Sequence, residues 1–112
     1  MQPATKTPLL DLFPDSATIA DGELALGGVA ISELARSFGT PLVVYDEATI
    51  RAQAAAYRDA APGALVVYGT KAFPSVAVMR LLAQLGVGAD VSTAGELAFA
   101  RAAGIPGDRL VV

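Results

Sequence analysis

The sequence has 112 residues, of which eight are basic and eleven acidic, for a net charge of −3. The basic residues are scattered and have no aromatic residues interleaved with them, so nucleic acid is not an expected partner. The chain has no cysteine and no histidine. Their absence excludes a disulfide framework, thiolate chemistry, the usual zinc sites and a histidine-based nucleophilic triad within this chain.

Hydrophobic residues make up 54% of the sequence, which is a large share for so short a chain. A domain of this size leaves much of its surface exposed, so we expect another subunit, or more of a longer protein, to cover apolar surface. No apolar run approaches the roughly 18 residues of a membrane helix, and the first eight residues lack the apolar core of a signal peptide. We therefore expect a cytoplasmic protein with no membrane partner.

The first 46 residues predict an arm followed by short elements. Three prolines lie within residues 1–16, which predicts an extended arm and not a helix, because proline removes amide donors and restricts its neighbours. The next expected elements are strands at 23–26 and 29–31, a helix over 32–38 capped by Ser32, and a buried strand at 42–45.

From residue 46 onward, helices and strands alternate. Asp46 is a suitable N-cap for a helix. The expected elements are a helix over 47–61, a strand at 65–71, a helix over 76–85 capped by Ser75, a strand at 87–91, a helix over 94–103 and a strand at 109–112. This alternation predicts an α/β fold, and because the sequence stops at Val112 within or at the end of an expected strand, we expect a fragment of a larger protein. An open Rossmann-like sheet and the first third of a (β/α)8 barrel both fit.

One of the two lysines in the chain, Lys71, closes the apolar run 65–71. In parallel α/β folds the functional residues lie at the carboxyl ends of the strands, and Asp90 lies near the end of the next expected strand. The two side chains could form a structural salt bridge. Alternatively, Lys71 could be a partly desolvated amine that forms a Schiff base.

Two phosphate-binding interpretations fail. A P-loop needs a Ser or Thr after its lysine, but here Thr70 precedes Lys71 and Ala72 follows it. No G-x-G-x-x-G follows any expected strand, which argues against an open nucleotide-binding domain. The spacing of Thr93 and Glu96 is that of a helix capping box, which by itself accounts for Glu96.

Four sequence motifs of this chain have the order and spacing in which they occur together in one enzyme family. They are Tyr68-Gly69-Thr70-Lys71-Ala72-Phe73-Pro74, the segment Gly88 to Leu97, the segment Gly39 to Asp46 and the segment Gly104 to Leu110. Over residues 22–112 the sequence resembles the N-terminal third of the diaminopimelate decarboxylases. These are pyridoxal-phosphate enzymes with an alanine racemase-like barrel (fold type III), and they are related to ornithine and arginine decarboxylases.

The resemblance implies that Lys71 forms the Schiff base with pyridoxal 5′-phosphate and that Asp90 and Glu96 lie near the cofactor in supporting roles. It also implies decarboxylation of a small-molecule amino acid, meso-diaminopimelate, to L-lysine and CO₂. Residues 47–112 would begin the (β/α)8 barrel. Residues 1–46 would be an arm and short strands that pack with a C-terminal β domain beyond this chain.

The resemblance further implies a homodimer in the full-length parent. It places the phosphate-binding loop, the substrate-binding groups and a partner-subunit cysteine beyond Val112, so we expect the chain alone to be inactive. Two alternatives stay open at this point. One is an ornithine- or arginine-type decarboxylase, and the other is a non-catalytic homologue that regulates by binding a partner.

Overall fold

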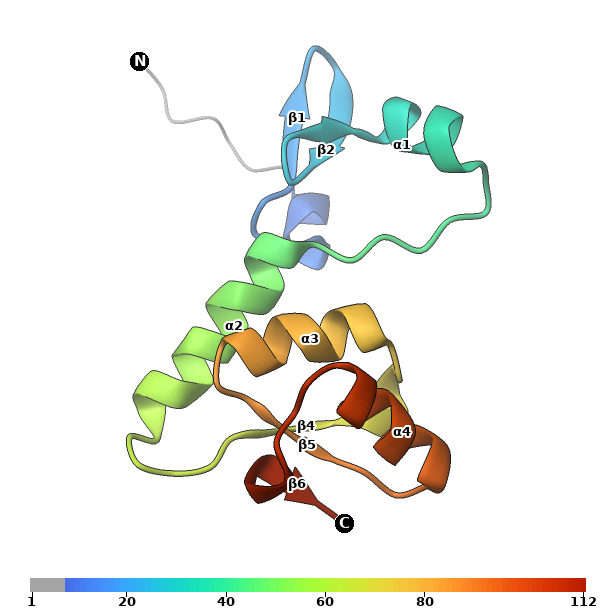
Figure 1. Cartoon of the computed structure of the whole chain (residues 1–112). Coiled ribbons are helices and arrows are strands. Elements are labelled where there is room, and N and C mark those ends of the chain that lie inside the picture. The colour runs from blue at the N-terminus through green and yellow to red at the C-terminus, as the bar shows by residue number, and fades with distance from the viewer. Residues whose placement is uncertain (1–7) are drawn as a thin grey trace. The chain divides into compact units, whose positions relative to one another are not determined.

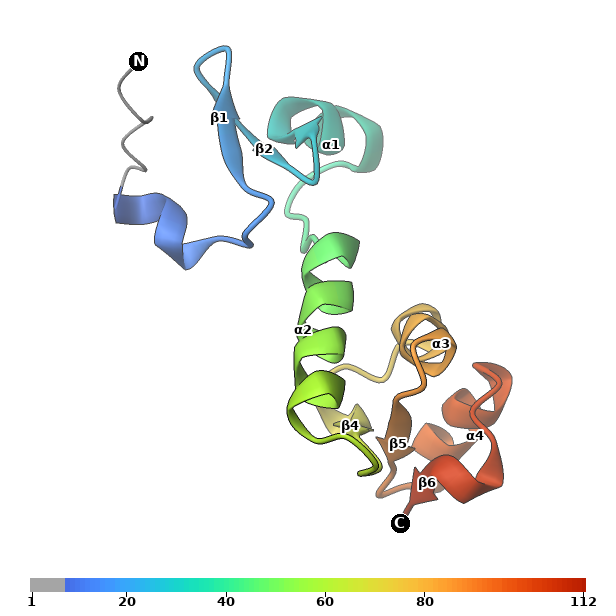
Figure 2. The ribbon, with the colours of Figure 1, turned by 90° about the vertical axis from the view of Figure 1, so that its left-hand side faces the viewer.

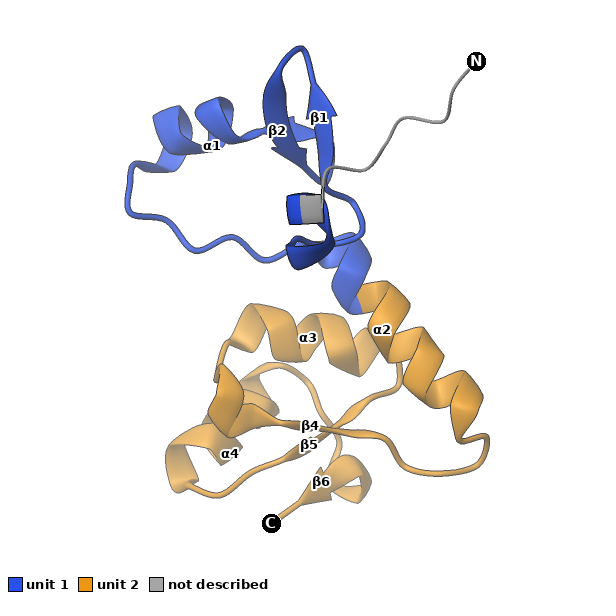
Figure 3. Cartoon of the chain, turned by 180° about the vertical axis from the view of Figure 1, so that it is seen from behind, with its two compact units in different colours: residues 1–50 blue, residues 51–112 orange. Residues whose placement is uncertain are grey.

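A computed structural model describes residues 8–112. The chain forms two compact units, and the boundary between them follows Ile50 (Figure 3). We call residues 8–50 the N-terminal unit and residues 51–112 the C-terminal unit. The first seven residues of the expected arm lie outside the described residues. In the part that the structure describes, no helix is long and apolar enough to cross a membrane.

The N-terminal unit is built on a small antiparallel sheet in the order β1-β2-β3 (Figure 1). Asp21 and Gly22 form the tight turn between β1 and β2, and both have positive φ angles, a conformation that Asp and Gly tolerate. The elements of this unit are the 3-10 helix η1 (Pro8–Leu12), β1 (Thr18–Ala20), β2 (Glu23–Leu26), β3 (Val29–Ala30) and helix α1 (Ile31–Phe38).

Two expectations for this unit are wrong. Pro8–Leu12 forms a 3-10 helix and not an extended arm, which proline permits because Pro8 stands at the first position, where no amide donor is needed. Residues 42–45 form no strand, and their large side chains are exposed. Their β-prone composition was not sufficient, because a strand also needs a neighbour to hydrogen-bond, and no described strand pairs with them.

The expected cap of α1 is also wrong, whereas the next cap is confirmed. Helix α1 begins at Ile31, so Ser32 lies inside its first turn, and the Glu23 carboxylate on β2 accepts the backbone N–H of Ser32 at 2.7 Å. Helix α2 (Glu47–Ala60) begins after Asp46 as expected, and the Asp46 carboxylate accepts the backbone N–H of Thr49 at 2.9 Å. A helix amide can thus be satisfied by a side chain from another element, which sequence spacing does not reveal.

The C-terminal unit contains a parallel sheet in the order β4-β5-β6 (Figure 2). Its elements after α2 are β4 (Val67–Gly69), the 3-10 turn η2 (Thr70–Ala72), helix α3 (Val76–Gln84), β5 (Gly88–Asp90), helix α4 (Ala94–Ala102), the 3-10 turn η3 (Gly107–Arg109) and β6 (Leu110–Val111). The predicted order of strands and helices is confirmed. The strands are shorter than expected, and the first ends at Gly69 and not at Lys71.

The core of the C-terminal unit lies on the face of the sheet that α3 and α4 cover. Ala89 and Val91 alternate along the chain and point to this face, where they pack with Met79 of α3 and Ala100 of α4. Tyr68 on β4 and Leu110 on β6, which flank Ala89 in register, pack against the same cluster. The alternate row, which includes Asp90, therefore faces the other side of the sheet.

Candidate active site

The candidate site is built at the carboxyl ends of β4 and β5. These strands are parallel, and their register pairs Gly69 with Asp90. Both strands therefore end at the same edge of the sheet. Strand β4 is followed by the turn η2, which carries Lys71, and β5 is followed by the loop that leads to α4. The alternation of apolar strands and capped helices in the sequence brings these segments together, because parallel strands must each be followed by a crossover.

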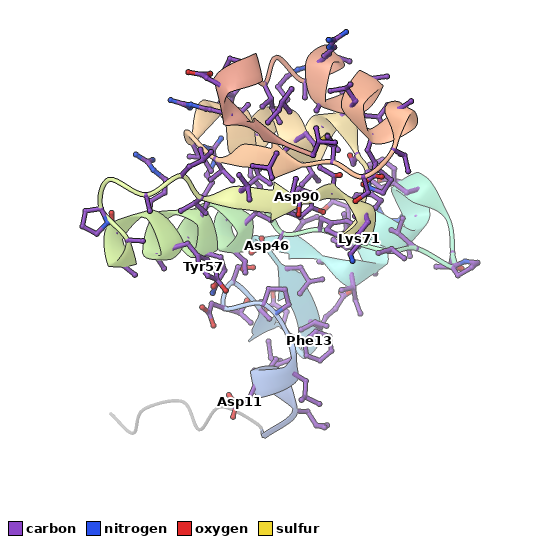
Figure 4. The ribbon with its side chains drawn as sticks, turned by 90° about the horizontal axis from the view of Figure 1, so that it is seen from below. Asp11, Phe13, Asp46, Tyr57, Lys71 and Asp90 are labelled. Atoms are coloured by element: carbon purple, nitrogen blue, oxygen red, sulfur yellow. The ribbon has the colours of Figure 1, made fainter. Side chains whose placement is uncertain are left out.

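Lys71 is exposed on the turn η2, two residues beyond Gly69. Figure 4 shows Lys71 and Asp90 on neighbouring segments. No ion pair joins Lys71 to Asp90 within residues 8–112. The structural salt bridge, one of the two interpretations of this pair, is therefore not formed, and the amine of Lys71 is not committed to a carboxylate.

A buried hydrogen-bond network lies directly beside the lysine turn. The hydroxyl of Thr70 lies 2.6 Å from Oε1 of Glu96 and 2.8 Å from the backbone carbonyl oxygen of Asp90. Its single proton serves one of these acceptors at a time or is shared between them. The Thr93 hydroxyl donates to Oε2 of Glu96 at 2.8 Å and accepts the backbone N–H of Glu96 at 3.1 Å. The network therefore joins η2, the end of β5 and the first turn of α4.

Hydrogen bonding keeps the carboxylate of Glu96 in its charged form. The Thr70 hydroxyl, followed by the Thr93 hydroxyl, lowers the pKa of Glu96 below its ordinary value, and burial opposes this shift without cancelling it. The backbone N–H groups of Ser92 and Thr93 act in the same direction as the hydroxyls. A negative charge is thus held next to the turn that carries Lys71.

The structure brings only some of the expected site residues together. Glu96 contacts the lysine turn through Thr70, so the capping box, which Thr93 does form, does not account fully for Glu96. Asp90 takes part through its backbone carbonyl, while its side chain is exposed. Sequence reasoning missed Thr70, whose only signal was a hydroxyl residue next to the lysine in an otherwise apolar strand end.

Lys71 presents an accessible amine at the carboxyl edge of the sheet. No group of three or more potential metal ligands lies close together in the described range 8–112. Lys71 is exposed in the described chain and not partly desolvated as expected, so the features that support a Schiff base are its accessibility and the absence of an ion pair at its amine.

Comparison with known proteins supports the same chemistry. Residues 47–112 match the family profile described as "Pyridoxal-dependent decarboxylase, pyridoxal binding domain". This match covers more than half of the chain and includes η2, Asp90 and α4.

The chain is similar to curated diaminopimelate decarboxylases. It is 47% identical over 111 residues to the enzyme of Actinosynnema pretiosum subsp. auranticum, covering 99% of this chain and 25% of that protein. It is 48% identical over 91 residues to the enzyme of Aquifex aeolicus, covering 81% of this chain and 22% of that protein. The chain thus spans about a quarter of the length of these relatives.

The chain is also similar to solved structures. A crystal structure of an Aquifex aeolicus protein matches with a TM-score of 0.87 and 44% identity, covering 91% of this chain and 26% of that one. The diaminopimelate decarboxylase of M. jannaschii, solved in complex with L-lysine, matches with a TM-score of 0.73 and 35% identity. That match covers 86% of this chain and 24% of the M. jannaschii chain.

Proposed function

Because the chain belongs to the pyridoxal-dependent decarboxylase family, we propose that it is part of an enzyme that converts meso-diaminopimelate to L-lysine and CO₂. The observation that carries this proposal is an uncommitted Lys71 on a turn beside the buried carboxylate of Glu96. The names of the curated relatives and the lysine complex of the M. jannaschii enzyme support the substrate and the product.

The residues present fit pyridoxal 5′-phosphate, the cofactor of this family. When bound, pyridoxal phosphate supplies an aldehyde to which an amine attaches and a pyridinium ring that accepts electrons. Lys71 would hold it covalently, since its side chain is exposed and no acidic partner occupies its amine in the described part of the chain. Glu96 and Asp90 would support the lysine and the cofactor from the first turn of α4 and the end of β5.

The same proposal extends to the architecture. The C-terminal unit would begin an alanine racemase-like (β/α)8 barrel, with α3 and α4 on its outer surface and the row of Asp90 facing inward. Its support is a parallel sheet whose core-facing row packs under both helices. In such barrels the site lies at the carboxyl ends of the strands, where Lys71 and Asp90 lie. This proposal includes a division of the chain into two parts. Residues 1–46 would pack with a β domain, and residues 47–112 would belong to the barrel.

The full-length enzyme would act in the cytoplasm as a homodimer on a small amino acid. The chain covers about a quarter of its relatives, so the remaining site groups would come from segments outside it. This is why we expect the 112 residues alone to be inactive.

The test uses the full-length protein. CO₂ release is measured with meso-diaminopimelate, ornithine and arginine, and Lys71→Ala is measured beside the wild type. We expect release from meso-diaminopimelate above all, and a loss of about 1,000-fold or more in the variant. Borohydride reduction with pyridoxal phosphate should attach the cofactor to the peptide that contains Lys71. Release from ornithine or arginine alone would refute the substrate, and an unlabelled but folded protein would refute the role of Lys71.

A further inference from the structure

Thr70 is the fully buried residue that immediately precedes Lys71. A buried hydroxyl ordinarily finds a hydrogen-bond partner, and Thr70 finds two possible acceptors on two other segments. Oε1 of Glu96 lies at 2.6 Å and the carbonyl oxygen of Asp90 at 2.8 Å. The proposed decarboxylation gives no role to this hydroxyl.

The position of the Lys71 amine depends on the backbone from which the side chain projects. A lysine side chain is a flexible four-carbon stem, and that of Lys71 is exposed, so its surroundings do little to fix it. The backbone turn Thr70–Ala72 is only three residues long, and no side chain caps its beginning at Gly69. Whatever holds this turn therefore determines where the amine can lie.

The side-chain hydroxyls of two residues, Tyr68 and Thr70, hold the turn from opposite sides. On one side, Thr70 ties it to the end of β5 and to the buried Glu96 of α4. On the other side, the hydroxyl of Tyr68 donates to the carbonyl of Phe73 at 3.1 Å. The Tyr68 bond is local, whereas the Thr70 bonds fix the turn relative to the next strand and helix. A displacement of about 1 Å in a reacting group can cost about 100-fold in rate.

We propose that Thr70 is a positioning residue whose hydroxyl holds the Lys71 turn against Glu96 and the Asp90 carbonyl, so that the lysine amine is placed for attachment of the cofactor. This inference rests on the proposed function. Thr70 touches neither cofactor nor substrate in this role and acts through the backbone of Lys71.

The experiment compares Thr70→Val in the full-length protein with a rescue variant and a matched control. Thr70→Val keeps the shape of the side chain and removes the hydroxyl, while Thr70→Ser restores the hydroxyl. The control is Thr49→Val, because the Thr49 hydroxyl also donates to a carboxylate, that of Asp46, at the start of α2. For each protein, the Kd for pyridoxal phosphate is measured by titration, and the fraction of Lys71 labelled by borohydride is measured by mass spectrometry.

We expect Thr70→Val to weaken cofactor binding about 10- to 100-fold, because a turn that is no longer fixed would misplace the lysine amine. Thr70→Ser should stay within about threefold of the wild type, and Thr49→Val should bind as the wild type does, even where its thermal midpoint falls as much as that of Thr70→Val. If Thr70→Val does not fold, the pair Thr70→Ser and Thr70→Ala carries the test, since they differ only in the hydroxyl.

Two results would overturn the inference while leaving the proposed function intact. One is wild-type affinity and labelling in Thr70→Val or Thr70→Ala. The other is an equal loss of affinity in Thr49→Val, which would mean that general destabilisation explains the effect. A folded wild-type protein that binds no pyridoxal phosphate would instead refute the proposed function, and this inference with it.

Discussion

The C-terminal unit buries a cluster of apolar side chains between its helices and sheet, whereas the N-terminal unit leaves most of its apolar side chains at its surface. In the C-terminal unit Met79, Val91 and Ile105 are buried. In residues 9–50 the buried residues are Ala17 and Ala25 alone, while the side chain of Leu12 is 82% exposed. The helices of the C-terminal unit cover one face of their sheet, and the three short strands of the N-terminal unit have too little chain to form a comparable core.

Polar side chains differ between the units in the same way. In the N-terminal unit the carboxylates of Glu23 and Asp46 satisfy helix amides at or near the surface. In the C-terminal unit Thr70 and Glu96 are buried and join separate elements. A unit with its own core can hold such a network in low dielectric, where its hydrogen bonds are strong. The proposed site therefore lies on the unit that has its own buried core.

The largest expected effect tests the close packing of the C-terminal sheet. A Cβ added at Gly88 would lie 2.2 Å from the backbone carbonyl oxygen of Arg109, which cannot move without displacing β6. Gly88→Ala should therefore lower the free energy of unfolding of the full-length protein by about 4 kcal/mol or more. Gly107→Ala is the matched control, because no atom lies within 4 Å of its added Cβ. Equal stability of the two variants in denaturant unfolding would contradict this packing.

The second prediction compares the two units directly through their apolar side chains. Met79 is fully buried, so Met79→Ala should cost about 3 kcal/mol, from lost burial and the cavity left behind. Leu12→Ala in the N-terminal unit should cost less than about 0.5 kcal/mol, because the side chain is mostly exposed. Denaturant unfolding measures both. A large loss in Leu12→Ala would show that another part of the full-length protein covers Leu12.

The third prediction concerns acid stability. The pKa of Glu96 is lowered from 4.5 in the folded chain, so its charged form stabilises the fold above that pH. This contribution is lost as the pH falls through the lower folded pKa. The thermal midpoint of the wild type should therefore fall below about pH 4.5. Glu96→Gln should have a lower midpoint at pH 7 and a flatter acid dependence, because glutamine does not titrate.

Asp46 provides the comparison for that experiment in the N-terminal unit. Hydrogen bonding by Thr49 also lowers the pKa of Asp46, but this carboxylate is less buried than Glu96. Asp46→Asn should flatten the acid dependence less than Glu96→Gln does, because solvent screens an exposed charge. The same acid profile in the wild type and Glu96→Gln would contradict the role given to the buried network.

The smallest expected effect separates two serines that the sequence predicts as helix caps. Ser75 caps α3, accepting the backbone N–H of Val78, so Ser75→Ala should cost about 1 kcal/mol. Ser32 lies inside α1 and does not cap it, and its side chain hydrogen-bonds Glu23 at the surface, so Ser32→Ala should cost only a few tenths of a kcal/mol. Denaturant unfolding of both variants checks this difference, and an equal cost would contradict it.

Sequence reasoning was more successful for the C-terminal unit than for the N-terminal unit. In the C-terminal unit the caps at Ser75 and Thr93 and the order of strands and helices were predicted from local patterns and are confirmed, whereas of the caps predicted in the N-terminal unit only that at Asp46 is. Capping and turn signals act between residues a few positions apart, so they can be read without a fold. The segment 42–45 failed because its β-prone residues find no pairing strand, and pairing depends on residues distant in sequence.

For the candidate site, too, some residues were predicted from the sequence, whereas their contacts were not. Lys71 was predicted as a site residue because it lies near the end of an apolar strand. The spacing of the strands predicted that Asp90 lies near it. The absence of an ion pair between them, in the described residues, depends on where the turn η2 directs the lysine side chain. The contact of Glu96 with Thr70 joins residues 26 positions apart, so the capping-box pattern does not reveal it.

By itself, the sequence determined the α/β alternation, the helix caps at Asp46, Ser75 and Thr93 and a single lysine suited to amine chemistry. These follow from composition and short-range spacing, which act before the chain is folded. Only the tertiary structure decided that Thr70, within the lysine turn, contacts Glu96 of α4. That contact exists because β4 and β5 are parallel and in register, which brings the first turn of α4 to the end of the neighbouring strand. The sequence shows the lysine, and the fold provides the buried network that holds its turn.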